Sequence, residues 1–420
     1  MAGANIPTLA WRNIWRNRRR TLITLISIAF GTLLAVLMTG IGDSSYSDMI
    51  DHAARLGGGH VIVQHETYVE MPSLKKTVRA DPEAIEEIRA QPQVRAAVPR
   101  VVGGVMLSTA ANSVGAGVIG IDPSAEDETT LGLVDAISEG QMFESPDDEG
   151  IILGKTLAEN LDVELGKKVV YTVTDKQGEI ASGLARVSGI IETGAAEIDA
   201  GTSFLPMNAF REQLGYEDDE VTQIAVFLDD HRASEALAAS LDQQLGDRLG
   251  PEAAAMPWFI ASPDLAGFIS MKVNGTVVFE IILTVLIAAG IFNTLFVSVM
   301  ERMRELGIMA AIGFSARQLF SLVLWESLWL GLCGIVAGVL LTAGPYYHLN
   351  TTGLDTAELM GSNGGAQVSG VTMEPILYVA IYPPNALYIA IAIVLATVTA
   401  GLYPAIKAGR VSPVETIRIV

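Results

Sequence analysis

The chain has 420 residues, of which 50% are hydrophobic and 18% are charged, and its mean hydropathy is +0.40. This apolar content excludes a disordered chain, and the net charge of −20 argues against a nucleic-acid-binding surface. The hydrophobic and the acidic residues lie in different parts of the sequence, so the averages describe neither part.

Four stretches of the sequence are each long and apolar enough to cross a bilayer, which takes about 20 residues. The first has no charged residue, is too long for the apolar core of a signal peptide and is followed by no small-residue cleavage site, so we expect an uncleaved anchor. In the third, Gly334 and Gly338 suggest a close helix contact. The predicted transmembrane helices are residues 21–42, 276–300, 318–343 and 386–404.

Basic residues beside these stretches predict the orientation of the chain. Residues 1–20, 301–317 and 405–420 carry net charges of +5, +1 and +2, so the rest of the chain carries −28. Because Lys and Arg accumulate on the cytoplasmic side of a membrane, we expect these three segments in the cytoplasm. The domain 43–275 and the loop 344–385 are then extracytoplasmic, and the acidity describes a solvated outer domain.

The residues before the first stretch predict an amphipathic helix over residues 1–20. Its apolar face is assigned to Leu9, Trp11, Ile14 and Trp15, and its polar face to Arg12, Asn13, Arg16 and Asn17. We expect this helix to lie on the anionic inner leaflet, although an ordinary surface helix is the alternative. The predicted membrane-surface residues are Trp11, Trp15, Arg12, Arg16, Arg18, Arg19 and Arg20.

The outer domain is predicted to be α+β. A glycine run at residues 57–59 interrupts a polar helix, and residues 98–121 have strand character with glycine interruptions. Alternation on both sides of a turn at 175–178 predicts a hairpin of residues 168–174 and 179–191. The other predicted elements are strands at 60–64, 150–154 and 221–228 and helices at 82–89, 155–160 and 232–245.

Several motifs resemble catalytic or binding signatures without meeting their requirements. Only three residues separate Gly150 from Gly154-Lys155-Thr156, whereas a P-loop needs four between its first glycine and the Gly-Lys-Thr. The G-x-G-x-x-G pattern at residues 115–120 is followed by Ile121-Asp122-Pro123, which stops any helix. His60 and His65 would face opposite sides of a strand, and the one cysteine, Cys333, lies inside the third span. We therefore expect a non-enzymatic chain that binds no metal and no cofactor.

The link between the second and third spans is the most informative segment. Its charged residues extend the second helix into water, and the apolar residues that follow are too few to cross the membrane. Gly307 and Gly313 allow bends, and a capping box from Ser315 to Gln318 starts the third helix. Such a short apolar helix needs a partner protein or lipid to cover it. The residues assigned to this contact are Glu301, Arg302, Arg304, Glu305, Leu306, Met309, Ala310, Ile312 and Gly313.

Polar residues inside the spans are expected to be paired or functional. Glu280 lies near the outer end of the second helix, whereas Asn293 and Glu326 lie deeper, near the cytoplasmic ends of their helices. We expect Asn293 and Glu326 to form hydrogen bonds between neighbouring helices. After the last span, Tyr403-Pro404 is predicted to end the helix, and a short helix is expected between residues 412 and 418.

The order of these parts resembles the MacB/FtsX-type, or mechanotransmission, ABC permeases. Residues 9–21 (LAWRNIWRNRRRT) look like that family's basic lead into its first span. Residues 150–158 (GIILGKTLA), with Leu165-Gly166, are similar to its outer-domain signature, and residues 301–313 (ERMRELGIMAAIG) look like its coupling helix. Residues 403–405 (YPA), with residues 412–416 (SPVET), look like the family's C-terminal motif.

The resemblance implies a multi-pass protein of the bacterial inner membrane that pairs with a second permease copy or homologue. Each permease would bind a cytoplasmic ABC ATPase, which carries ATP and Mg²⁺, and residues 301–313 would transmit its movement to the outer domain. Unlike MacB, this chain carries no fused ATPase and looks most like the lipoprotein-releasing LolC/LolE type. A lipoprotein substrate and a periplasmic carrier are therefore expected, and the alternatives are a MacB-like efflux permease and an FtsX-like regulator of a periplasmic enzyme.

Overall fold

The computed structural model describes residues 5–132, 136–193, 196–355, 367–368, 371–372 and 376–411. The chain forms two compact units. The helical unit contains Met1–Ser45, Ser270–Thr356 and Ile376–Val420, and the α/β unit contains Tyr46–Ile269 and Ala357–Pro375.

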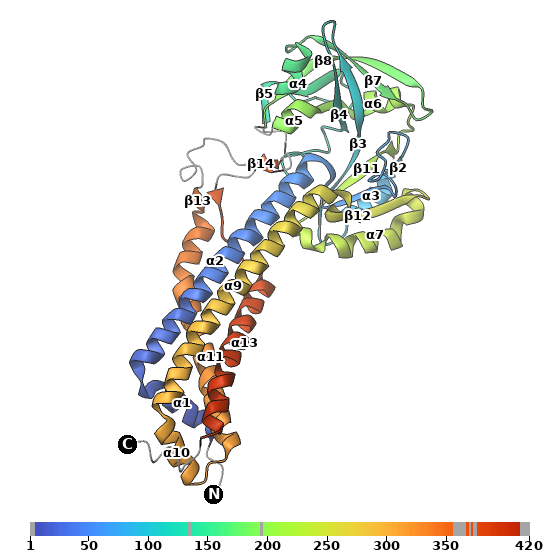
Figure 1. Ribbon diagram of the computed structural model, residues 1–420. Helices are drawn as coiled ribbons and strands as arrows, with labels where there is room; N and C mark the ends of the chain where they lie inside the picture. The colour runs from blue at the N-terminus through green and yellow to red at the C-terminus, as the bar shows by residue number, and fades with distance from the viewer. Residues whose placement is uncertain are drawn as a thin grey trace. The chain divides into compact units, whose positions relative to one another are not determined.

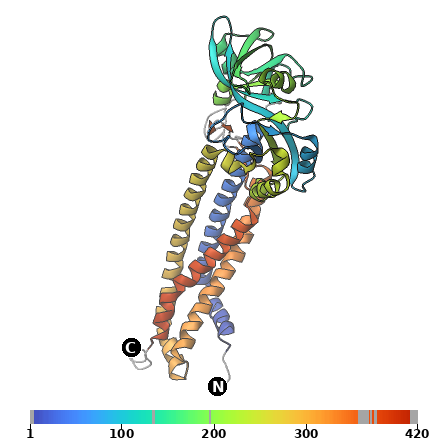
Figure 2. The same cartoon turned by 90° about the vertical axis from the view of Figure 1, so that its right-hand side faces the viewer.

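The helical unit is built on four long helices that lie side by side (Figures 1 and 2). These are α2 (Arg18–Ala53), α9 (Pro263–Glu301), α11 (Ala316–Thr351) and α13 (Pro383–Gly409). In the described part of the chain, these are the four helices that are long and apolar enough to cross a membrane. The predicted class, four candidate transmembrane helices with a mixed α/β domain, is thereby confirmed.

Shorter elements complete this part of the fold. In the helical unit these are the helices α1 (Ile6–Arg16) and α10 (Met303–Ala311) and the antiparallel pair β13 (Leu354–Asp355) with β16 (Ile376–Leu377), whereas the antiparallel pair β14 (Gln367–Val368) with β15 (Val371–Thr372) belongs to the α/β unit. The prediction that Tyr403-Pro404 ends the last helix is wrong, because α13 continues to Gly409 with Pro404 buried inside it. A helix between membrane-spanning neighbours tolerates the one backbone hydrogen bond that proline removes. The helix predicted after residue 412 lies outside the described residues.

Glycines allow α2 and α11 to approach closely, as predicted from the spacing of Gly334 and Gly338. A Cβ atom on Gly334 would lie 2.7 Å from Cβ of Ile28, and one on Gly338 would lie 2.6 Å from Cβ of Thr32. Both separations are shorter than carbon atoms tolerate, so only glycine fits at these two positions. In a membrane, lipid gives helices no hydrophobic reason to associate, so small residues stabilise their contact by letting the backbones approach closely.

The α/β unit is organised around one long strand, β3 (Val94–Ser108). The first half of β3 pairs with β11 (Gln223–Leu228), which is followed in the sheet by β1 (Val61–His65) and β12 (Ala253–Pro257). The second half of β3 begins a ring of six strands, since it pairs with both β4 and β7. The ring runs in the order β3, β4 (Ser113–Ile121), β9 (Thr202–Pro206), β6 (Gly150–Gly154), β8 (Ile180–Ile191) and β7 (Lys168–Thr174). Outside it, β5 (Ile137–Gly140) pairs with β8, and β2 (Val78–Arg79) pairs with β10 (Glu220–Val221).

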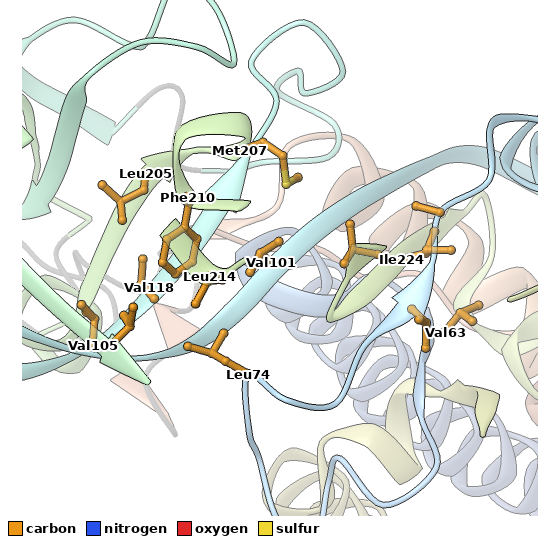
Figure 3. Packing of buried hydrophobic residues seen from close by; sticks show 14 of the residues in the cluster. Val63, Leu74, Val101, Val105, Val118, Leu205, Met207, Phe210, Leu214 and Ile224 are labelled. Atoms are coloured by element: carbon orange, nitrogen blue, oxygen red, sulfur yellow. The ribbon is translucent and has the colours of Figure 1, made fainter. Parts of the chain in front are cut away.

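Buried aliphatic side chains hold the strands and helices of this unit together. Figure 3 shows Val101 and Val118 of neighbouring strands close to Phe210 and Leu214 of α6 (Met207–Leu214). The unit contains no cysteine, so this core stabilises it without disulfide bonds.

The remaining helical segments are α3 (Pro82–Arg89), α4 (Lys155–Leu161), α5 (Ala196–Gly201), α7 (Ser234–Leu249), α8 (Trp258–Ala261), the 3₁₀ turn His231–Ala233 and the π-helical turn Ala54–Gly58.

Most predicted elements of this unit are present. The hairpin forms β7 and β8 with Thr174 opposite Ile180, and the G-x-G-x-x-G pattern lies within β4. The region 98–121 is two antiparallel strands, and the turn at 109–112 that connects them was not predicted. The break at 57–59 is a π-helical turn that ends at Gly59, whose φ of +79° favours glycine.

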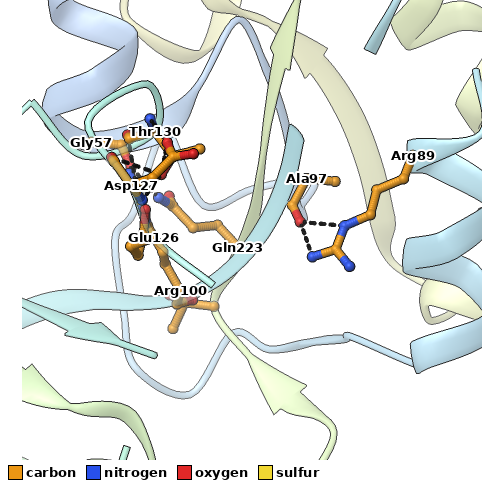
Figure 4. A network of polar contacts seen from close by, with 9 residues as sticks. Gly57, Arg89, Ala97, Arg100, Glu126, Asp127, Thr130 and Gln223 are labelled. Atoms are coloured by element: carbon orange, nitrogen blue, oxygen red, sulfur yellow. Dashed lines mark hydrogen bonds and ion pairs between the residues drawn. The ribbon is translucent and has the colours of Figure 1, made fainter. Parts of the chain in front are cut away.

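A buried arginine on β3 ties three segments of the α/β unit together (Figure 4). Arg100 forms a two-point ion pair with Glu126, with Nε–Oε1 and Nη2–Oε2 distances of 2.7 and 2.8 Å, and both side chains are at most 1% exposed. The same guanidinium donates to the carbonyl oxygens of Gly57 and Thr130. Arg100 therefore fixes the end of the helix that begins with α2 to the sheet and to the loop that follows β4.

We predict that Arg100→Met lowers the free energy of unfolding of the α/β unit by about 3–5 kcal/mol, because it leaves the Glu126 carboxylate buried without its counter-ion. Hydrogen–deuterium exchange of β3 and residues 54–58 in the full chain measures this loss. The control is Arg79→Met, which removes an exposed ion pair with Glu217 and Asp219 and should cost under about 1 kcal/mol. Equal effects of the two substitutions would contradict the role of Arg100.

A histidine of the same unit resists protonation. His231 lies beside His60 and Trp258, with ring centroids 6.5 and 6.4 Å from its own. Burial, and secondarily the charge of Arg232, lower the pKa of His231 to about 4. The unfolded chain, in which histidine titrates near pH 6.5, therefore binds a proton that the folded unit does not bind between pH 6.5 and 4.

We predict that the stability of the α/β unit falls as the pH falls from 6.5 to 4, by about 3 kcal/mol at most from this residue. Unfolding of the full chain in urea, followed at several pH values, measures the effect. His231→Gln should flatten this part of the profile, whereas the control His348→Gln, outside the unit, should not. A profile unchanged by His231→Gln would contradict the assignment.

Candidate functional site

The candidate site lies at the end of the helical unit where α1 and α10 are found (Figures 1 and 2). The chain leaves α9 at Glu301, turns at Arg302, forms α10, and turns again into α11. Arg302 has φ −102° and ψ 11°, which interrupts the helix without a proline or a glycine. The link predicted between the second and third spans is thus a separate short helix.

Two caps fix where α10 ends and α11 begins. Gly313 has a φ of +106°, and the N–H groups of Gly313 and Phe314 donate to the carbonyls of Ala310 and Met309, which is a Schellman motif. The predicted capping box is present, because Ser315 Oγ accepts from the Gln318 N–H and Gln318 Oε1 accepts from the Ser315 N–H. Gly313 therefore makes a turn, whereas Gly307, which was also expected to allow a bend, lies inside α10.

The inner face of α10 packs against the other helices. Leu306 is 2% exposed and belongs to a cluster with Val299, Leu319 and Ala405, and Met309 and Ala310 are partly buried against it. The assignment of Leu306 to a contact surface is therefore wrong, because its side chain is buried among the helices of this chain. The sequence could not distinguish the two faces, since each carries large apolar side chains.

The outer face of α10 presents a stripe of exposed side chains at helical spacing. Arg304, Ile308 and Ile312 succeed one another every four residues, and the two isoleucines are 49% and 60% exposed. Two isoleucines exposed beside an arginine form a surface that a partner can cover. We call Arg304, Ile308 and Ile312 the α10 stripe; Ile308 was not among the contact residues expected from the sequence.

Ion pairs connect the N-terminal segment to the α9–α10 corner. Arg16 of α1 binds Glu305 of α10, and this hydrogen bond is the main reason that the pKa of Glu305 is lowered. Arg20 binds Glu301 at 2.7 Å and also contacts the hydroxyl of Ser298. The residues expected to bind membrane or a partner thus also bind one another.

Glu326 is the buried acid of this site. Its Oε1 atom accepts from Asn13 Nδ2 at 2.8 Å and from Arg302 Nη1 at 3.2 Å. The hydrogen bonding expected of Glu326 is present, but its partners lie on α1 and at the α9–α10 turn rather than on another membrane-spanning helix. Asn13 was placed on the polar face of α1 and, like Ser298, was missed as a site residue.

The other two polar residues of the spans lie elsewhere. Glu280 accepts a hydrogen bond from Thr39 of α2. Asn293 is exposed on α9, so the expectation that it joins neighbouring helices of this chain is wrong. Asn293 precedes the inward-facing Ser298 by five residues, which turns it about 140° away on a helix of 3.6 residues per turn.

Helix α1 packs against α11 through a face that differs from the predicted one. Ala10 and Ile14 are buried, whereas Trp11 and Trp15 are exposed. The Trp11 and Trp329 rings are 5.3 Å apart, and Trp329 Nε1 donates to the carbonyl of Pro7. The two exposed tryptophans lie beside the exposed residues Arg12, Arg18 and Arg19.

Known families match both parts of this architecture. The MacB-like periplasmic core domain matches residues 21–244, and the FtsX-like permease C-terminal domain matches residues 277–413. Among the described residues, no group of three His, Cys, Asp or Glu side chains is arranged to hold a metal ion.

Curated relatives agree with these matches. An uncharacterized ABC transporter permease of Methanocaldococcus jannaschii is 23% identical over 99% of this chain and 98% of its own length. The lipoprotein-releasing system transmembrane protein LolC of Xylella fastidiosa (strain 9a5c) is 26% identical over 71% of this chain and 72% of its own. The macrolide export ATP-binding/permease protein MacB of Bordetella avium is 24% identical over 96% of this chain but only 58% of its own length. The chain therefore belongs to the family of ABC transporter permeases that join a MacB-like periplasmic core domain to an FtsX-like C-terminal domain.

Proposed function

We propose that this permease couples ATP hydrolysis by a separate cytoplasmic ATPase to movement of its α/β unit, and so extracts lipoproteins from the membrane for release to a carrier. An ABC permease implies a cytoplasmic ATPase partner, and the α10 stripe is the surface that we assign to it. The stripe carries the proposal because its two isoleucines are exposed on a helix whose opposite face is anchored by Leu306. ATP and Mg²⁺ would bind the ATPase rather than this chain.

The proposal includes an orientation of the chain in the membrane. Both termini and α10 would lie in the cytoplasm of a bacterial cell and the α/β unit in the periplasm, as the excess of basic residues in residues 1–20, 301–317 and 405–420 favours. The permease would act as a pair, with a second copy or a homologue. The ionic links of Arg16 and Arg20 to α10 and α9 would carry movement of α10 to α2, which continues into the α/β unit.

Support for a lipoprotein substrate comes from the LolC relative, which this chain matches over similar shares of both sequences. The MacB relative matches over nearly all of this chain, and efflux of a macrolide-like compound is therefore the second candidate. Proteoliposomes that contain the full chain, its co-expressed ATPase and a triacylated lipoprotein distinguish the two. ATP should move the lipoprotein into the aqueous phase; ATP-driven uptake of erythromycin without lipoprotein release would favour efflux.

We predict that Ile308→Asp with Ile312→Asp weakens ATPase binding and ATP-driven substrate movement at least tenfold, because the exchange places two carboxylates in an apolar contact. Copurification of the ATPase and the coupled hydrolysis rate measure the effect. Ile260→Asp is the matched control, since Ile260 is 51% exposed in the α/β unit. Normal coupling in the double variant would refute the assignment of the α10 stripe.

A further inference from the structure

A cavity with both polar and apolar lining residues lies between α1, α2, α9 and α11. Its volume is about 220 Å³, which exceeds what one structural water needs. The lining residues come from four separate segments of the helical unit. They are Asn13, Ile14, Arg16, Asn17, Arg20, Thr21, Thr24, Thr294, Leu295, Ser298, Glu301, Arg302, Glu326 and Leu330.

The lining carries charges of both signs. Three guanidinium groups, those of Arg16, Arg20 and Arg302, share the cavity with the carboxylates of Glu301 and Glu326. Each guanidinium has five N–H donors, and Arg302 donates through Nε to Glu305 and through Nη1 to Glu326. Arg302 therefore retains N–H groups for another acceptor. A ligand that complements this lining needs an anionic and a cationic group close together.

The cavity lies where the surface of the helical unit changes from apolar to charged. On α2, Leu22, Ile23 and Ile26 are more than half exposed just beyond Arg20. On α1, Trp11 and Trp15 are exposed beside arginines, the composition typical of a membrane interface. A group bound in the cavity would therefore lie at the depth of lipid headgroups, with hydrocarbon beside α2.

We propose that this cavity binds the headgroup of a phosphatidylethanolamine-type lipid. The phosphate accepts hydrogen bonds from the guanidinium groups of Arg20 and Arg302, and the primary ammonium donates to the carboxylates of Glu301 and Glu326. A purely anionic headgroup leaves the carboxylates without a new partner, and a trimethylated choline has no N–H to donate to them. The lipid site is independent of what the permease transports.

Native mass spectrometry of the full chain tests the proposal. The protein is delipidated in detergent and titrated separately with palmitoyl-oleoyl phosphatidylethanolamine, phosphatidylcholine and phosphatidylglycerol. We expect one tightly retained phosphatidylethanolamine per chain and at least tenfold weaker retention of the other two lipids. Equal retention of all three lipids would overturn the proposal. Soluble phosphoethanolamine is a further arm, and binding of it as tight as that of the lipid would mean a site for a soluble phosphate ester instead.

Two variants connect the lipid to the cavity. Arg20→Gln removes a phosphate donor, and Thr294→Phe fills the cavity without changing its charge, so each should weaken retention of phosphatidylethanolamine at least tenfold. Arg19→Gln is the matched control, because Arg19 is exposed and does not line the cavity. Wild-type retention in both cavity variants, or an equal loss in Arg19→Gln, would contradict the site. Neither readout requires the ATPase, so the result is separate from that of the proposed function.

Discussion

A single buried carboxylate organises the end of the helical unit. Glu326 belongs to α11 and its side chain is buried, where an unpaired charge would destabilise the fold by several kcal/mol. The bonds that it accepts from Asn13 and Arg302 connect α11 to α1 and to the turn between α9 and α10. Because the acid needs both donors to be tolerated, it couples the positions of three segments that are far apart in the sequence.

Two ion pairs near this carboxylate also join the N-terminal segment to the α9–α10 corner. Arg16 and Arg20 bind Glu305 and Glu301, which flank Arg302 in the chain. Basic residues on the N-terminal segment thus face acidic residues of the α9–α10 corner. The apolar surface of α10 is divided accordingly, because its inner face is occupied by Leu306 and its outer face carries the α10 stripe.

Sequence patterns predicted the presence of helices and strands better than the helix faces that pack against one another. The length of the apolar stretches was enough to identify four spans, and the capping box at Ser315 and the hairpin turn at residues 175–178 depend on local chemistry alone. The inward faces of α1 and α9 depend on the rotation of each helix against its neighbours. Asn293 and Glu326 therefore look equivalent in the sequence, although one is exposed and the other buried.

The six-stranded ring affects how the α/β unit meets other proteins. Each strand of the ring has a partner on both sides, so the two ends of the described strand order are β5 and β12. A strand added by another chain would find few places to pair. The ring thereby limits edge-to-edge association of this domain with its own copies, because sheets merge through strands that lack a neighbour.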